Sequence, residues 1–206
     1  MVVVGGHGGL GGPIADELES RGARTLRVSR STEPSIDLRD VDAGEQLVAA
    51  AVERFGRLDG VVVAAGIVAF GDVVETDDAV IEELFLTNAL GPLWLARRVL
   101  PALRETGGFF LNVSAVVAER PTAGMVAYSA SKAAAAAMIV GLRNELRRTG
   151  VTVIDVRPPH TETGLATRPL AGTAGRLPPG KDPLDVARRI VAAIQAGDQE
   201  LASTAF

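Results

Sequence analysis

Cysteine is absent from this chain of 206 residues, and histidine occurs only twice. Without cysteine there is neither a disulfide framework nor a thiolate metal site. His7 and His160 are too isolated in the sequence to form a metal cluster with each other. The sequence therefore predicts no metal site.

The chain also lacks an excess of positive charge and a long apolar run. Its formal net charge is -4 and its isoelectric point is near 5.3, so no broad basic surface is expected for nucleic acid or anionic lipid. No uninterrupted apolar run reaches the roughly 18–20 residues of a membrane helix, and glycines near the N-terminus break any signal-peptide core. These absences favour a cytoplasmic protein with a small-molecule ligand and without nucleic-acid or membrane partners.

Hydrophobic residues make up 47% of the chain and charged residues 22%, a balance that permits a sizeable core. Short runs rich in β-branched residues alternate with longer segments whose apolar residues recur three and four apart. The predicted strands are 2–4, 25–28, 60–64, 109–113 and 151–156. The predicted helices are 13–20, 42–55, 77–103, 127–148 and 183–196, the last with Asp182 as its N-cap.

This alternation predicts an α/β protein with one domain over residues 1–206. Its expected architecture is a single Rossmann-type doubly wound parallel sheet with helices on both faces. Residues 168–181 combine glycine, proline and arginine with little periodicity, which predicts a long functional loop or lid. Near the C-terminus, residues 200–203 form at best a short edge strand.

The first predicted strand leads into a turn in which six glycines and one proline occupy nine positions, from Gly5 to Pro13. Glycines let the backbone turn tightly and approach a pyrophosphate, whose charge then meets free N–H groups at the start of the next helix. The spacing is looser than G-x-G-x-x-G, and the alternative is a turn that only connects strand to helix. The turn indicates a dinucleotide site.

The only tyrosine, Tyr128, stands four residues before Lys132, one of only two lysines in the chain. Residues four apart on a helix share a face. A nearby ammonium favours the phenolate, so we expect Lys132 to lower the pKa of Tyr128 towards the working pH. Tyr128 would then act as general acid or base. The alternative is a packed tyrosine beside a solvated lysine.

These motifs, in this order along nearly the whole chain, resemble the short-chain dehydrogenase/reductase family. The matching segments are Val4–Gly11 for T-G-x-x-x-G-x-G, Val63–Gly66 for N-N-A-G, and Tyr128–Lys132 for Y-x-x-x-K. Valine replaces the threonine of the first motif, and both asparagines of the second motif are lost.

The resemblance implies roles for individual residues. Asn88 would support a proton-relaying water, and Lys132 would also hold the nicotinamide ribose. Asp37 and Leu38 would contact the adenine. Further contacts to the dinucleotide would come from Gly5, His7, Gly8, Gly9, Leu10, Gly11, Ala64, Ala65, Gly66, Tyr128, Pro158, Thr161 and Thr163.

The end of the second predicted strand decides the expected form of the cofactor. An acidic residue there would bind the adenosine ribose hydroxyls and repel a 2′-phosphate, whereas this chain has Ser29-Arg30-Ser31. Because a guanidinium suits phosphate, NADP is predicted in preference to NAD, with both serines as further donors. The alternative is an exposed surface arginine. Too few residues separate Arg30 from Ile36 for a crossover helix, so a third strand must be short and reached by a loop.

The family uses a serine at the end of its fifth strand, the counterpart of the predicted strand 109–113, to bind the substrate oxygen, and its place is taken here by Ala115. Ser114 stands one position earlier and would face the opposite way on a strand. Either Ser114 is re-aimed and acts as the catalytic serine, or the site lacks one donor. We favour the second reading. His160 is a candidate substrate contact.

The predicted function is interconversion of a small carbonyl compound and its alcohol by an NADP-dependent oxidoreductase. One alternative is an NADP-binding regulatory protein without turnover, and another is a non-redox isomerase or cyclase that uses the same acid–base pair. A homodimer is expected through the helices that start near Glu82 and Ala127.

Overall fold

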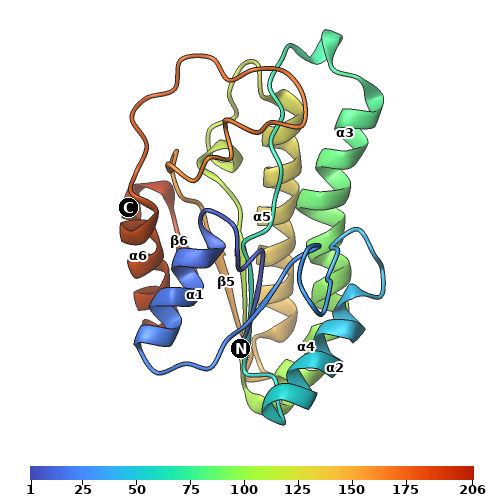
Figure 1. Ribbon diagram of the computed structural model, residues 1–206, viewed down its shortest axis with the longest axis vertical. Helices are drawn as coiled ribbons and strands as arrows, with labels where there is room; N and C mark the ends of the chain where they lie inside the picture. The colour runs from blue at the N-terminus through green and yellow to red at the C-terminus, as the bar shows by residue number, and fades with distance from the viewer.

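In the computed structural model, which describes all residues 1–206, six parallel strands form one sheet (Figure 1). The strand order is β2-β1-β3-β4-β5-β6. The strands are β1 (Val2–Val4), β2 (Leu26–Val28), β3 (Gly60–Val63), β4 (Phe109–Val113), β5 (Thr152–Val156) and β6 (Glu200–Leu201). Each predicted strand is therefore confirmed to within one residue at either end, and the predicted edge strand 200–203 is present as a shorter one.

Helices cover both faces of this sheet, as predicted (Figure 1). One face carries α1 (Gly11–Ser20) and α6 (Pro183–Ala196), which pack against each other. The opposite face carries α2 (Ala43–Phe55), α4 (Gly91–Thr106) and α5 (Val126–Leu146), with α3 (Asp78–Phe85) leading into α4. The shorter helical turns are η1 (Val73–Glu75), η2 (Leu86–Leu90), η3 (Val116–Ala118) and η4 (Ser203–Ala205).

The period-two alternation of β1 divides the core into two layers. Val2 and Val4 pack with Leu47 of α2 and Leu95 of α4, whereas Val3 packs in the cluster that contains α1 and α6. All three valines are at most 1% exposed. Burial of each such side chain contributes about 1.5–3 kcal/mol, so the sheet is fixed from both faces.

The predicted helix 77–103 is wrong in one respect, because η2 interrupts it with a turn of π-helix. The continuous helical stretch Asp78–Thr106 has 29 residues, and by length and composition alone it is apolar enough to cross a membrane. Charged residues such as Glu82, Glu83 and Arg97 interrupt this stretch, so it is not the uninterrupted apolar run whose absence the sequence indicated. Core helices meet the same criterion, and Leu95, Val99 and Leu103 of this stretch are buried in the core.

The other connections follow the sequence closely. No regular third strand forms after β2, and a single bridge between Ser29 and Ser35 takes its place. Asp182 caps α6 as predicted, because its side chain accepts hydrogen bonds from the N–H groups of Leu184 and Asp185. Residues 168–181 contain no helix or strand. They form the long loop at the top of Figure 1.

Candidate active site

A cleft of about 1080 Å³ lies at the carboxyl ends of the strands, between the glycine turn and the start of α5. Parallel sheets of this type open a crevice where the strand order reverses, here between β1 and β3. Pockets for small ligands usually measure about 300–1,000 Å³. The cleft therefore has room for an elongated ligand.

The turn between β1 and α1 consists mostly of glycine because backbone atoms of other residues approach it too closely for side chains. A Cβ on Gly5, whose φ is +80°, would lie 2.8 Å from the backbone nitrogen of Ala65. A Cβ on Gly9 would lie 2.2 Å from the carbonyl oxygen of Thr163, and one on Gly11 would lie 2.1 Å from the carbonyl oxygen of Gly5. No side chain caps the N-terminus of α1, which leaves this end of the helix suited to an anion.

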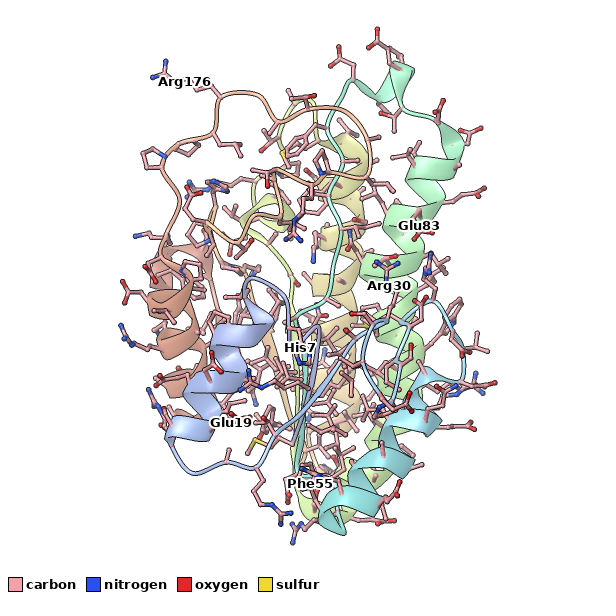
Figure 2. The ribbon with its side chains drawn as sticks, viewed as in Figure 1. His7, Glu19, Arg30, Phe55, Glu83 and Arg176 are labelled. Atoms are coloured by element: carbon pink, nitrogen blue, oxygen red, sulfur yellow. The ribbon has the colours of Figure 1, made fainter.

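The segment after β2 brings a cation to one end of the cleft. Ser29, Arg30 and Ser31 all line it, and the two serine hydroxyl oxygens lie 3.2 Å apart. Arg30 is exposed, and Figure 2 shows its side chain on the side of the molecule that carries Glu83. No ion pair joins Arg30 to an acidic side chain.

Asp37 also lines the cleft, but a second cation holds its carboxylate. Arg39 Nη2 lies 2.6 Å from Asp37 Oδ2, and Arg39 Nη1 lies 3.1 Å from Glu83 Oε1. Hydrogen bonds from Arg39 hold the pKa of Asp37 below its usual range. The predicted contact to adenine would have to share this carboxylate with Arg39. Sequence reasoning did not predict Arg39 as a cleft residue.

Tyr128 and Lys132 lie together on α5 at the buried end of the cleft, 7% and 5% exposed. Lys132 Nζ donates a hydrogen bond to the carbonyl oxygen of Val113 at 3.0 Å. Burial raises the pKa of Tyr128, and burial lowers the pKa of Lys132 to about 8. The expected lowering of the Tyr128 pKa by Lys132 is therefore wrong for this structure, because desolvation of the phenolate dominates.

Asn88 lies in the π-helical turn η2, behind the cleft rather than on its surface. Its Oδ1 accepts from the N–H of Ile67 at 3.0 Å, and its Nδ2 donates to the carbonyl of Ile67 at 2.9 Å and to Ser131 Oγ at 3.1 Å. A Cβ on Gly66 would lie 3.1 Å from both Asn88 Oδ1 and Lys132 Nζ. Asn88 thus fastens the turn after β3 to α5.

The hydroxyl of Ser114 points to a buried carboxylate. Its Oγ donates to Asp155 Oδ1 at 2.5 Å and accepts from Asn112 Nδ2 at 3.3 Å. Although β4 has already ended at Val113, this bond engages the hydroxyl that the substrate oxygen would need. Ala115 lines the cleft in an extended conformation. The sequence pattern did not indicate a role for Asp155.

The loop after β5 forms the remaining side of the cleft. Pro158, His160, Thr161 and Thr163 all line it. His160 Nε2 lies 3.5 Å from Glu162 Oε1. The cleft surface thus includes every predicted site residue except Gly11 and Asn88. Arg176 also lines the cleft, and Figure 2 shows it at the far end of this loop segment.

Comparison with known proteins gives matches over most of the chain. The family model for short chain dehydrogenase matches residues 1–171. An uncharacterised oxidoreductase of Staphylococcus saprophyticus is 29% identical, and the alignment covers 94% of this chain and 90% of that protein. A short-chain dehydrogenase of Penicillium ochrochloron is 30% identical over 94% of this chain and 74% of that protein.

Among solved structures, a short chain dehydrogenase from Burkholderia cenocepacia in complex with NADP is 29% identical. It superposes with a TM-score of 0.84 over 98% of this chain and 86% of that one. The likeness therefore extends from the sequence to the whole Rossmann-type sheet. Together with the family match over residues 1–171, it shows that this chain belongs to the short-chain dehydrogenase/reductase family.

Proposed function

We propose that the protein is an NADP(H)-dependent oxidoreductase that interconverts a small carbonyl compound and its alcohol, with Tyr128 and Lys132 as its acid–base pair. The observation that carries this proposal is one continuous cleft with the glycine turn and Arg30 at one end and Tyr128 and Lys132 at the other. That arrangement suits a dinucleotide whose reactive ring lies beside the tyrosine.

The residues present fit a nicotinamide dinucleotide. Gly5, Gly9 and Gly11 leave no room for side chains, so backbone N–H groups can approach a pyrophosphate. The free guanidinium of Arg30 suits a 2′-phosphate, and the Burkholderia relative was solved with NADP. When bound, the cofactor supplies or accepts the hydride.

The chain's own residues would position the substrate and move the proton. Burial keeps Tyr128 as a neutral phenol, so its Oη can donate a proton to a carbonyl oxygen during reduction. Lys132 supplies positive charge beside this position and is a candidate for holding the ribose hydroxyls. Val116, Met125 and Leu165 pack against the apolar cluster that contains Tyr128, which would limit the access of water to this position.

The test is a panel of small ketones and aldehydes with NADPH and NADH, followed by loss of cofactor absorbance. We expect NADPH oxidation on some members of the panel, no turnover in Tyr128→Phe, and retained NADPH binding in that variant. Full activity in Tyr128→Phe would contradict the mechanism. Product formation without a change in cofactor absorbance would instead support a non-redox isomerase or cyclase.

A second candidate function is dinucleotide binding without redox turnover. It is favoured by one observation: Ala115 takes the place of the usual catalytic serine, while Ser114 is bonded to Asp155. Enhanced NADPH fluorescence on binding, with no oxidation against the whole panel, would favour this function over the first.

We also infer a homodimer that forms through the outer faces of α4 and α5. Leu90 and Leu93 near the start of α4 are 41% and 42% exposed, and Val126 and Val140 of α5 are 48% and 50% exposed. Exposed apolar side chains on helices that contact each other favour a partner surface. Light scattering on the purified protein measures the mass, and a monomer would contradict this inference.

A further inference from the structure

Asp155 is a buried carboxylate for which the proposed reaction has no use. It belongs to β5, where it pairs in register with Asn112 of β4, and it is 3% exposed. It does not line the cleft. Burial of a charged carboxylate costs free energy unless the charge is paired, so Asp155 needs partners at this position.

Two groups contact this carboxylate directly. Ser114 Oγ donates to Oδ1 at 2.5 Å, and Arg157 Nε lies 3.1 Å from Oδ2. Arg157 is shared, because its guanidinium also lies 3.2 Å from Glu119 and contacts Glu200. One guanidinium among three carboxylates leaves net negative charge on this side of β5, which favours a further cation nearby.

Two cations of α5 face the cluster. Arg143 donates to the carbonyl oxygens of Val153 and Gln199 and lies 3.9 Å from Glu200, at the outer edge. Lys132 is the inner, buried cation, and its Nζ donates to the carbonyl oxygen of Val113, the residue immediately before Ser114. The Val113–Ser114 segment thus connects the ammonium to the carboxylate.

The two buried groups stabilise each other's charge. The Asp155 carboxylate raises the pKa of Lys132 and so opposes the effect of burial, which lowers it to about 8. Burial raises the pKa of Asp155, while the Ser114 hydroxyl and the charges of Arg157, Arg143 and Lys132 act in the opposite direction. Tyr128, one turn earlier on α5, is the other buried titratable group at this end of the cleft.

We propose that Asp155 is a positioning residue for Lys132: it keeps the ammonium charged and in place at the buried end of the cleft, and Ser114 binds this carboxylate instead of the substrate oxygen. The inference rests on the proposed function in so far as Lys132 belongs to its acid–base pair. Asp155 itself has no access to the cleft, so it acts on Lys132 and not on the substrate.

The chain offers a direct test, because Lys132 and Lys181 are its only lysines. Selective ¹³C labelling of lysine gives one side-chain signal for each, and exposed Lys181 serves as the internal reference. We expect Asp155→Asn to lower the titration midpoint of Lys132 by about one pH unit or more, relative to Lys181.

Glu119→Gln is the matched control, since it also converts a carboxylate to an amide in the Arg157 cluster. We expect it to leave the Lys132 midpoint unchanged within a few tenths of a pH unit. If Asp155→Asn does not fold, the wild-type protein still provides the test. Its Lys132 signal should show a second inflection in acid, when Asp155 takes up a proton, and the Lys181 signal should not.

An unchanged Lys132 midpoint in folded Asp155→Asn would overturn the proposal, and so would a wild-type Lys132 signal without the acid inflection. In an active preparation, the alkaline limb of the kcat profile should move to lower pH in Asp155→Asn, whereas a purely structural role would lower kcat equally at every pH. The titration needs no turnover. A protein that oxidises no NADPH would therefore count against the proposed function alone.

Discussion

Arg30 and Arg39 stand close together at one end of the cleft, yet only Arg39 is paired with carboxylates, those of Asp37 and Glu83. The charge of Arg30 is available to a ligand because no ion pair engages it. An unpaired, exposed guanidinium can form charge-assisted, bidentate hydrogen bonds with a phosphate, and these are stronger than its hydrogen bonds with water. Selectivity between NADPH and NADH should therefore depend on this one side chain.

We expect Arg30→Ala to raise the KM for NADPH by about 10- to 150-fold, equivalent to about 1.5–3 kcal/mol for a charge-assisted contact. The KM for NADH should change little, because NADH has no 2′-phosphate. Initial rates with both cofactors on one substrate provide the measurement. Equal effects on NADPH and NADH would show that Arg30 does not read the phosphate.

The position of Ala115 leads to a second prediction. Ala115→Ser should place a hydroxyl on the cleft surface and raise kcat on a carbonyl substrate by at least about tenfold, since loss of such a donor costs about 2.7–4 kcal/mol in other enzymes. Ser114→Ala should change kcat by less than about threefold, because its hydroxyl is bonded to Asp155. A large loss in Ser114→Ala with no gain in Ala115→Ser, and with the titration midpoint of Lys132 unchanged, would identify Ser114 as the working donor.

The π-helical turn η2 connects α3 to α4 and carries Asn88, whose amide pairs both the N–H and the carbonyl of Ile67. Asn88→Ala would leave these backbone groups unpaired in a partly buried place. We expect the free energy of unfolding to fall by about 2–3 kcal/mol, measured by urea denaturation.

Thr87→Ala provides the control for this substitution. Thr87 neighbours Asn88 in the same turn, but its hydroxyl makes only a 3.3 Å contact to Glu83 on the surface of the helix. We expect a loss below about 1 kcal/mol. If both substitutions cost the same, the effect belongs to the helical turn and not to the bonds of Asn88.

Strands and most helices could be predicted from the sequence because their burial is periodic. The valine run of β1 and the apolar spacing of α2 and α4 can each be recognised within a short segment of the sequence. The π-helical turn was missed because a single extra residue barely disturbs a 3.6-residue period. The bounds of the last helix match the predicted 183–196, whereas the ends of the other helices differ by up to three residues, because apolar periodicity does not mark where a helix ends.

The candidate site was predicted less completely, and the omissions share a cause. Arg39 and Asp155 acquire their significance from Glu83 and Ser114, residues more than 40 positions away in the chain. A lone acidic residue in a strand gives no sign of being buried. The rise in the pKa of Tyr128 could not be predicted, because the spacing shows the lysine nearby but not the loss of solvent around the phenol.

For the molecule as a whole, the buried Lys132 links stability to pH. Its pKa falls from the ordinary 10.5 to about 8, so the unfolded chain binds more protons between these values. The free energy of unfolding should therefore rise between about pH 8 and pH 10, by on the order of 2–3 kcal/mol. The raised pKa of Tyr128 acts in the opposite direction above about pH 10.

Urea denaturation at intervals from pH 7 to pH 10 would measure this rise in the wild type and in Lys132→Met. The variant removes the titrating group while it retains a long apolar stem, so we expect its stability to stay nearly level over this range. A parallel rise in both proteins would assign the pH dependence to other groups.

The π-helical turn has a geometric consequence for the assembly of the fold. One extra residue in a helix advances its later part by about 100° about the axis. Val80 and Leu84 of α3 accordingly pack with the group around Tyr128, while Leu95 and Val99 of α4 pack with α2 and the sheet. A regular α-helix without this turn would have its apolar residues on one face and would pack that face against one neighbour. Because of this rotation, α3 forms part of the surroundings of the active site, whereas α4 forms part of the core.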